Sequence, residues 1–338
     1  MARRGGWRRL GRRKPFRYVD ANGNRITDPA KLERIESLVI PPAWRDVWIS
    51  PRPRAKLQAT GIDVAGRRQY LYHQDFRAER EQEKFDKLVR FAEHLPQFRE
   101  AMAEHMELDP FVRERVCAVA VRLINLGWFR VGSERYAKTA RTYGITTLTK
   151  RHVDVRGKRV CFSFRGKGNA RIRSVIVDPE LAGDVRQLLQ LEGGSRLFRY
   201  RRNGDLAPLS ATLLNEYIRT YMGEEFTAKD FRTWGGTLIA AVRLAERGVA
   251  DTETEAKRRV AAVMTSVADQ LGNTPAVARA SYVSPAVVEQ YLEGRTIDDF
   301  RPRHLRVVGA RDLGLNAEEQ SVLSLLRSWR MRRARLAA

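Results

Sequence analysis

Along the first 75 residues, hydrophobic and polar side chains alternate in short runs. Residues 47–49, 56–62 and 67–73 have a period of two and are bounded by turns that contain Pro and Gly, which predicts short strands. Asn22-Gly23, a favoured two-residue turn, predicts a hairpin over residues 16–27. Asp28-Pro29 predicts the start of a helix that ends before Pro41. We therefore expect a β-rich unit, preceded by a mobile Arg- and Gly-rich tail over residues 1–15.

The hydrophobic period changes to that of helices from Gln74 onward. Helices are expected over residues 77–104, over 111–126 after Asp109-Pro110, and from Ser133 to Gly144. The period returns to two over residues 145–177, where turns at 156–157 and 165–168 predict an antiparallel meander of three strands. After Asp178-Pro179, every further element is predicted to be a helix: 180–192, 211–222, 228–247, 252–271, 275–282 and 285–293. A capping box of Asn316 and Glu319 predicts the start of a last, Arg-rich helix.

These patterns together predict an α+β protein with two domains. The first is a small β-rich N-terminal domain over residues 1–80. The second is a larger, mostly helical domain over residues 81–338 that carries a small three-stranded antiparallel sheet. No apolar run reaches 18 residues, so we expect no membrane span, and no apolar segment follows the basic N-terminus as in a secretory signal.

The charge of the chain points to a polyanionic partner. Lys and Arg number 63 against 40 Asp and Glu, which gives a net charge of +23 over 338 residues, and nucleic acid is the commonest polyanion. The two cysteines, Cys117 and Cys161, exclude a disulfide scaffold and a four-cysteine zinc site, and suggest a reducing, intracellular compartment. Five scattered histidines argue against a catalytic transition-metal site.

Two phosphoryl-transfer motifs are absent from the chain. It has no Gly-x-x-x-x-Gly-Lys-Ser/Thr loop for ATP phosphates, and no Asp-x-Asp cluster that would hold paired Mg²⁺ ions. Phosphoryl chemistry would therefore depend on cationic side chains, together with a protein nucleophile or an activated water molecule.

Cationic residues in special local settings are candidates for this chemistry, although each also has an ordinary structural explanation. Lys167 stands in a Gly-rich turn between two strands and reaches either a ligand or solvent. Lys229 and Arg232, three positions apart in the first turns of a helix, suit an anion but also suit an ordinary surface pair. Arg130 lies between large apolar residues, where a buried Arg pairs with either a phosphate or a structural carboxylate.

Asn273 and Tyr282 complete the candidates. Asn273 stands in a tight junction between two predicted helices, where its amide can face a ligand. Tyr282 ends the second of these helices, and a single tyrosine in such a place more often packs in the core.

The order of these residues resembles a known catalytic core. An Arg, a hairpin Lys, a Lys-x-x-Arg and a Gly-Asn followed nine positions later by Tyr282 resemble the core shared by type IB DNA topoisomerases and tyrosine recombinases. The small bacterial and poxvirus branch of the type IB enzymes is the more similar one, because residues 40–44, 61–73 and 128–132 also agree with it. The resemblance extends from about residue 16 to residue 293.

The resemblance implies an enzyme that relaxes supercoiled duplex DNA by transient cleavage and religation of one strand through a 3′-phosphotyrosyl intermediate. Tyr282 would be the nucleophile, and Lys167 the general acid for the leaving 5′-oxygen. Arg130, Arg232 and Asn273 would contact the nonbridging oxygens of the scissile phosphate. Many members have His where this chain has Asn273, and Asn cannot add positive charge. Further DNA contacts are implied at Arg67, Gln69, Tyr70, Tyr72, Arg135, Tyr136 and Lys229.

The resemblance also implies the conditions under which the protein works. It would need no ATP and no metal, with Mg²⁺ only stimulating turnover. We expect a monomer bound to duplex DNA, without an obligate protein partner, in the nucleoid of a bacterial-type cytoplasm. Two alternatives remain open: a tyrosine site-specific recombinase that uses the same positions in a tetramer, and a non-catalytic architectural DNA-binding protein. Relaxation of supercoiled DNA by the purified protein distinguishes the three.

Overall fold

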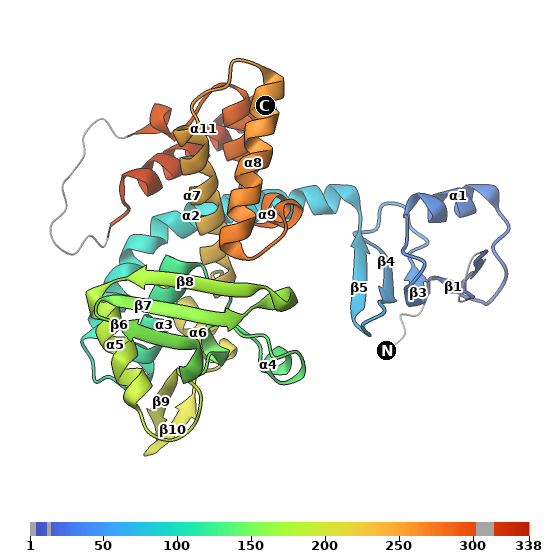
Figure 1. Cartoon of the computed structure of the whole chain (residues 1–338). Helices are drawn as coiled ribbons and strands as arrows, with labels where there is room; N and C mark the ends of the chain where they lie inside the picture. Colours follow the sequence, from blue (N-terminus) through green and yellow to red (C-terminus); the bar gives the residue numbers. More distant parts are fainter. Residues whose placement is uncertain (1–4, 12–14, 302–313, 338) are drawn as a thin grey trace. The chain divides into compact units, whose positions relative to one another are not determined.

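The computed structural model describes residues 5–11, 15–301 and 314–337 and has the mixed α and β content expected (Figure 1). The chain divides into two compact units, Met1–Phe85 and Asp86–Ala338. The division falls inside the long helix α2 (Gln74–Met106). The domain boundary predicted from the sequence, at residue 80, lies in the same helix.

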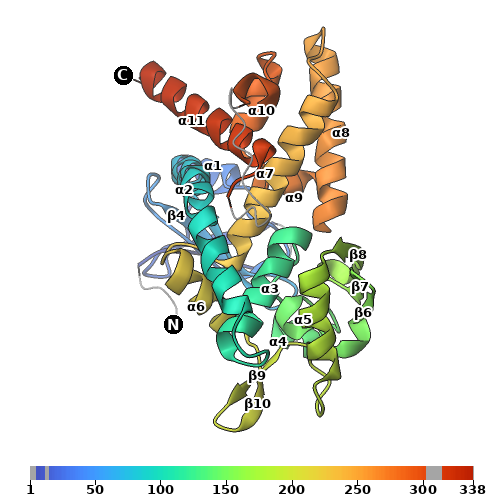
Figure 2. The same cartoon turned by 90° about the vertical axis from the view of Figure 1, so that its left-hand side faces the viewer.

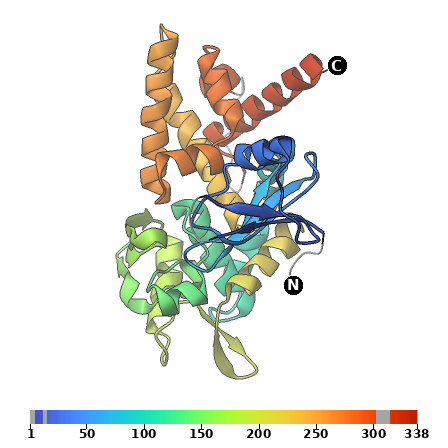
Figure 3. The same ribbon diagram turned by 90° about the vertical axis from the view of Figure 1, so that its right-hand side faces the viewer.

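The N-terminal unit is a five-stranded antiparallel sheet with one helix beside it (Figure 3). The strands follow the order β2-β1-β3-β4-β5, with bounds Arg17–Val19, Trp7–Leu10, Arg45–Ile49, Leu57–Ile62 and Arg68–Tyr72. Helix α1 (Pro29–Ser37) begins as predicted, with Pro29 in its first turn and the Asp28 side chain accepting from the backbone N–H of Ala30. Ile35 of α1 packs with Trp7, Val47, Ile49 and Ala59 to form the core of this unit.

The prediction of a mobile tail is wrong for residues 7–10, which form strand β1 in the interior of the sheet. Trp7 and Arg9 point inward from this strand and are both about nine-tenths buried. The Arg9 guanidinium donates to the backbone oxygens of Pro41 at 3.1 Å and Trp44 at 2.6 Å, so its burial is compensated by hydrogen bonds. The Arg-rich composition of this segment concealed the inward Trp and Arg. Residues 1–4 and 12–14 of the expected tail lie outside the described residues.

The turn predicted at Asn22-Gly23 is confirmed, with Gly23 at a φ of 91°. The hairpin around it is shorter than expected, because only the isolated bridge between Val19 and Arg25 closes it. Strand β2 instead pairs mainly with β1.

The C-terminal unit is built around helix α7 (Ala228–Glu246), which packs against α3, α6, α8, α10 and α11 (Figure 2). These neighbours span Arg113–Gly127, Ala211–Met222, Glu253–Leu271, Pro285–Leu292 and Ala317–Ala337, and the short helices α4 and α9 span Glu134–Thr139 and Pro275–Ser281. Trp234 and Phe231 of α7 are fully buried beside Phe91 of α2. The predicted capping box is confirmed at the start of α11, where Asn316 and Glu319 bond each other's backbone N–H at 3.1 and 2.8 Å.

The predicted meander is confirmed as the antiparallel sheet β6-β7-β8, with bounds Val153–Arg156, Arg159–Arg165 and Arg171–Val177. It begins later than expected, because residues 145–152 form two 3₁₀ turns instead of a strand. Helix α5 (Pro179–Gln190) packs against β6 and β7, and Asp178 caps it.

The expectation that only helices follow Asp178 is wrong. Strands β9 (Arg199–Arg202) and β10 (Asp205–Pro208) form a hairpin. Asn203 and Gly204 stand between them in the left-handed region, with φ of 51° and 89°. The sequence therefore carried the same Asn-Gly signal here as at Asn22-Gly23.

Two helix ends also differ from the prediction. Helix α3 begins at Arg113 after Val112, so Asp109 does not cap it, and Trp128 after its last residue adopts a left-handed φ of 49°. Helix α4 ends at Thr139 instead of Gly144. Cys117 and Cys161 form no disulfide, and none of the described helices is long and apolar enough to cross a membrane.

Candidate active site

Arg232 is the most deeply buried charge among the candidate residues, with only 4% of its surface exposed. Its guanidinium donates to the carbonyl of Trp128, at the end of α3, and to the carbonyl of Leu271, the last residue of α8, at 2.6 Å. The last carbonyls of a helix lack partners within that helix, so these acceptors suit a cation. No carboxylate neutralises the guanidinium, and its Nε is buried without a partner among the described residues. The position thus retains a positive charge available to an anion.

Burial, and next the charge of Arg130, lower the pKa of Arg232 to about 10. At neutral pH the guanidinium remains protonated, because this value lies well above 7. The lowered pKa shows that an additional negative charge in the site would be favoured.

Arg130 and Asn273 meet at the junction between α8 and α9. The Arg130 guanidinium donates to the backbone oxygen of Gly272 at 3.0 Å and to the side-chain oxygen of Asn273. Gly272 permits this junction because it ends α8 at a φ of 61°. The amide nitrogen of Asn273 is buried without a partner in the described part of the chain. Asn273 therefore orients Arg130 and still has hydrogen-bond donors for a ligand.

Tyr282 follows the last residue of α9 and is 8% exposed. The guanidinium carbon of Arg232 lies 5.1 Å from the centre of the Tyr282 ring. Burial alone raises the pKa of the Tyr282 hydroxyl, but the positive charges of Arg232, Arg130 and Lys229 outweigh it, so that the pKa lies below its ordinary value. The arrangement favours a phenolate, which is the nucleophilic form.

Lys167 occupies the tip of the β7–β8 hairpin, in a turn over Lys167–Asn169. Gly166 N–H donates to Ala170 O at 2.8 Å and closes this turn, and the Lys167 side chain is exposed. Lys167, Arg130 and Arg232 line one cavity of about 500 Å³, which Gly272 also borders. Tyr282 and Asn273 do not line it directly, and each contacts one of its arginines instead. The fold thus gathers all five predicted catalytic residues within the C-terminal unit.

Two residues of α7 that sequence reasoning missed hold the site close together. A Cβ on Gly235 would lie 2.2 Å from the Trp128 indole nitrogen, and a Cβ on Gly236 would lie 2.6 Å from the Tyr282 carbonyl oxygen. The next residue, Thr237, donates its hydroxyl to that same carbonyl at 3.2 Å. A Gly-Gly pair inside a predicted helix, where each Gly costs about 1 kcal/mol relative to Ala, was the available signal.

Gly236→Ala is expected to slow the chemistry of this site. The added methyl group meets backbone and cannot be accommodated by a rotamer change, so Tyr282 must shift. We expect a loss of about 1–2 kcal/mol in the free energy of unfolding, and roughly 10–100-fold slower reaction at Tyr282. Thermal unfolding and adduct formation with DNA measure the two effects. Gly183→Ala in α5 is the control, because a Cβ there would meet no described atom within 4 Å beyond its chain neighbours and the nearby backbone of its own helix; equal effects of both changes would contradict the argument.

The residues predicted to contact DNA lie at the surface of both units. Tyr70 and Tyr72 on the edge strand β5 are 49% and 40% exposed, and their rings stack at 6.3 Å. Asp63 holds the neighbouring side chains, pairing with Arg67 and accepting from Gln69 at 2.8 Å. In the C-terminal unit, α4 and α7 carry the other three, which are all exposed: Arg135, Tyr136 and Lys229.

A second cavity, of about 690 Å³, extends the positive surface beyond the predicted residues. It shares Tyr143, Arg171 and Arg173 with the first cavity and is further lined by Arg141, Arg151 and Arg165. These arginines are not among the residues predicted from the sequence, and they come together only when the sheet folds against residues 140–152. Within residues 5–11, 15–301 and 314–337, no three His, Cys, Asp or Glu residues come together as a metal site.

Comparison with known proteins shows what the chain is similar to. The family described as "Eukaryotic DNA topoisomerase I, catalytic core" matches residues 73–298, and the one described as "Bacterial DNA topoisomerase IB, N-terminal domain" matches residues 15–63. The chain is 33% identical over 284 residues to the DNA topoisomerase 1B of Acanthamoeba polyphaga mimivirus, which covers 82% of this chain and 84% of that protein. It is 21% identical over 245 residues to the DNA topoisomerase 1B of vaccinia virus (strain Copenhagen), covering 72% and 75%.

Proposed function

Because the chain belongs to the type IB DNA topoisomerase family, we propose that it relaxes supercoiled duplex DNA by cutting and rejoining one strand through Tyr282. The observation that carries this proposal is the contact between Tyr282 and Arg232. A buried guanidinium that has no carboxylate partner among the described residues both favours the phenolate and attracts a phosphate.

In the proposed reaction, Tyr282 first loses its hydroxyl proton to solvent, and the resulting phenolate oxygen attacks the phosphorus of a phosphodiester and forms a new phosphorus–oxygen bond. The bond to the 5′-oxygen breaks, and Lys167 gives that oxygen its proton. The products are a 3′-phosphotyrosyl enzyme and a free 5′-hydroxyl. One phosphodiester is exchanged for another, so the number of phosphoester bonds is conserved and religation needs no outside energy source. While the 5′ end is free, torsion in the duplex drives its rotation, and supercoils of either sign relax.

We propose that three side chains stabilise the charge that develops on the nonbridging oxygens: Arg130, Arg232 and Asn273. The cavity that the two arginines line supports this role, as do the unpaired buried nitrogens Nε of Arg232 and Nδ2 of Asn273 among the described residues. The Asn273 amide neither gains nor loses a proton at neutral pH, so we propose that it takes no part in proton transfer.

We further propose that seven residues at the surface of the two units bind the duplex, all of them exposed except the partly buried Gln69. These are Arg67, Gln69, Tyr70 and Tyr72 in the first unit, and Arg135, Tyr136 and Lys229 in the second. The net charge of +23 and the Arg-lined second cavity support this role.

We propose a monomer without an obligate protein partner, acting on nucleoid DNA in a bacterial cytoplasm. The match of residues 15–63 to a bacterial domain supports the setting. The last helix, α11, supports the monomer because it packs on its own chain. Its Glu319 pairs with Arg99, and its Trp329 donates to Glu289 at 2.6 Å.

Relaxation is expected to proceed in EDTA without ATP. Cationic side chains take the place of metal ions in the proposed site, and the phosphotyrosyl bond conserves the energy for religation. Relaxation of negatively supercoiled plasmid, followed on agarose gels with and without EDTA, measures this. Mg²⁺ is expected to speed turnover without being required. An absolute dependence on a divalent ion or on ATP would contradict the mechanism.

A further inference from the structure

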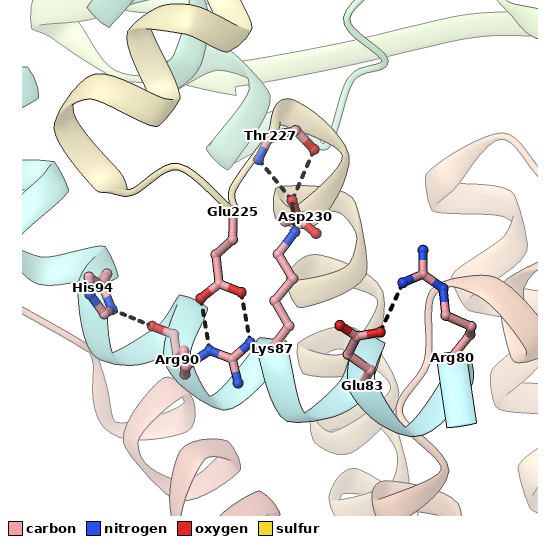
Figure 4. Close-up of polar contacts among 8 residues, drawn as sticks. All are labelled: Arg80, Glu83, Lys87, Arg90, His94, Glu225, Thr227 and Asp230. Carbon is pink, nitrogen blue, oxygen red and sulfur yellow. Dashed lines mark hydrogen bonds and ion pairs between the residues drawn. The ribbon is translucent and has the colours of Figure 1, made fainter. Parts of the chain in front are cut away.

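Helix α2 holds the beginning of the catalytic helix α7 through two ion pairs (Figure 4). Lys87 Nζ lies 2.8 Å from Asp230 Oδ2, and Arg90 makes a two-pronged pair with Glu225 at 2.8 and 2.7 Å. Both carboxylates belong to the segment that leads into α7 and its first turn. All four residues lie in the C-terminal unit.

An aromatic contact also joins α2 to α7 and to the segment that leads into it. The Phe91 ring of α2 packs edge-on against Phe231 at 4.9 Å and against Phe226 at 5.7 Å. Lys87 Nζ also lies 5.5 Å from the centre of the Phe226 ring. Phe231 directly precedes Arg232 in the sequence. The packing of α2 against Phe231 therefore fixes the position of the Arg232 backbone.

Asp230 differs from Glu225 because it is part of the helix cap. Its Oδ2 accepts from the Thr227 backbone N–H at 2.8 Å and from the Thr227 hydroxyl at 2.9 Å, in addition to the Lys87 ammonium. The side chains of Asp230 and Lys87 are only 17% and 21% exposed, so solvent screens this pair less than a surface pair.

The position of Asp230 creates an electrostatic conflict that Lys87 resolves. In the sequence, Asp230 comes directly after Lys229 and two positions before Arg232, both of which the proposed reaction directs at a phosphate. An uncompensated carboxylate in this turn would add a negative charge to the helix start that carries both cations, and it would weaken their attraction for a phosphate. Lys87 cancels its charge while the cap hydrogen bonds remain in place.

We propose that Lys87 is a positioning residue of the cleavage reaction, which holds and neutralises Asp230 so that Lys229 and Arg232 serve the phosphate. This inference rests on the proposed function, because it takes Arg232 as a phosphate ligand. Lys87 itself does not touch the reacting atoms; it acts through Asp230.

The test uses Lys87→Met, which keeps the stem beside Phe226 and removes the charge. Single-turnover formation of the covalent adduct on a labelled duplex, with protein in excess, is expected to slow about tenfold, as for one lost charge interaction in a partly buried site. The dissociation constant for the same duplex is expected to change less than about twofold. The duplex makes many phosphate contacts with the protein, and Lys87 affects one of them only indirectly, through Asp230. Lys87→Arg is expected to cleave at nearly the parent rate.

The decisive measurement is rescue by a second change. Asn at position 230 keeps an oxygen for the cap but carries no charge. Lys87→Met combined with Asp230→Asn is therefore expected to return to near the parent cleavage rate. A merely structural role of Lys87 predicts no rescue, because the double variant lacks the ion pair as well.

Arg90→Ala is the matched control, because it removes the neighbouring pair between α2 and the same junction. Its thermal stability is expected to fall slightly, while its cleavage rate stays at the parent value. Equal slowing by Arg90→Ala and Lys87→Met, or a double variant without rescue, would overturn the inference. A parent rate in Lys87→Met would overturn it as well, while leaving the proposed function intact. A parent protein that forms no adduct at Tyr282 would overturn both.

Discussion

Tyr282→Phe is expected to abolish the covalent adduct with DNA. The change removes only the hydroxyl, so the ring keeps its place 5.1 Å from Arg232, and the backbone keeps its hydrogen bond with Thr237. Without the nucleophile, strand cleavage is expected to slow by at least about 10⁴-fold, as for loss of a catalytic nucleophile in other enzymes. Duplex affinity is expected to remain within about twofold, because the charged groups that contact phosphates are unchanged.

The adduct is measured by denaturing the reaction on an end-labelled duplex, and its attachment site by peptide mapping. Tyr291→Phe is a matched control in the next helix, α10, where the hydroxyl donates to Gly248 O at 2.9 Å. Losing that hydrogen bond costs about 1 kcal/mol of stability and is expected to leave cleavage unchanged. A Tyr282→Phe protein that still relaxes supercoiled plasmid would place the nucleophile elsewhere.

Lys167→Ala is expected to slow cleavage by about 10²–10⁴-fold, the usual contribution of a general acid. Lys167 makes no structural ion pair or hydrogen bond among the described contacts, and it stands exposed at a hairpin tip beside the cavity of Arg130 and Arg232. Truncation is therefore expected to leave folding and DNA affinity nearly intact. Single-turnover cleavage and duplex binding measure the two effects separately.

The role of Lys167 as an acid is tested by changing the leaving group. When sulfur replaces the bridging 5′-oxygen, the thiolate leaves without a proton, so Lys167→Ala is expected to recover almost to the parent rate. Arg232→Ala is the comparison, and it is expected to recover less, because the proposed role of this guanidinium is to stabilise the nonbridging oxygens. Arg130→Ala is expected to recover partly if that arginine also assists the proton. Failure of sulfur to restore Lys167→Ala would mean that Lys167 acts only through its charge.

Local signals in the sequence were sufficient for most of the helices. The structure confirms the helix starts predicted at Asp28, at Asp178 and at the Asn316–Glu319 pair. These starts could be predicted because the side chains that cap a helix lie within three residues of its first backbone N–H groups. Asp109-Pro110 carried the same kind of signal without forming a cap, since α3 begins only after Val112. Local capping chemistry permits a helix start, while packing decides which start is used.

Strands were less predictable where their pairing is distant. Strand β1 lies in an Arg-rich segment, and its pairing with β3 joins Trp7 to Ile49, far along the chain. Its two inward residues find their partners only when the sheet forms: Trp7 packs in the apolar core, and Arg9 donates hydrogen bonds to backbone carbonyls. The β9–β10 hairpin is different, because its Asn203-Gly204 turn was visible in the sequence and was overlooked among helical patterns.

The sequence by itself supplied the candidate residues of the site: a tyrosine, a hairpin lysine, two arginines and an asparagine, in an order that resembles the core shared by type IB DNA topoisomerases and tyrosine recombinases. Only the tertiary structure decided how that chemistry is tuned. The carbonyls that hold Arg232 come from 104 and 39 positions away, and the ammonium that neutralises Asp230 comes from 143 positions away. Helix periods and caps act over a few residues, whereas burial and opposed charges depend on which distant segments the core brings together.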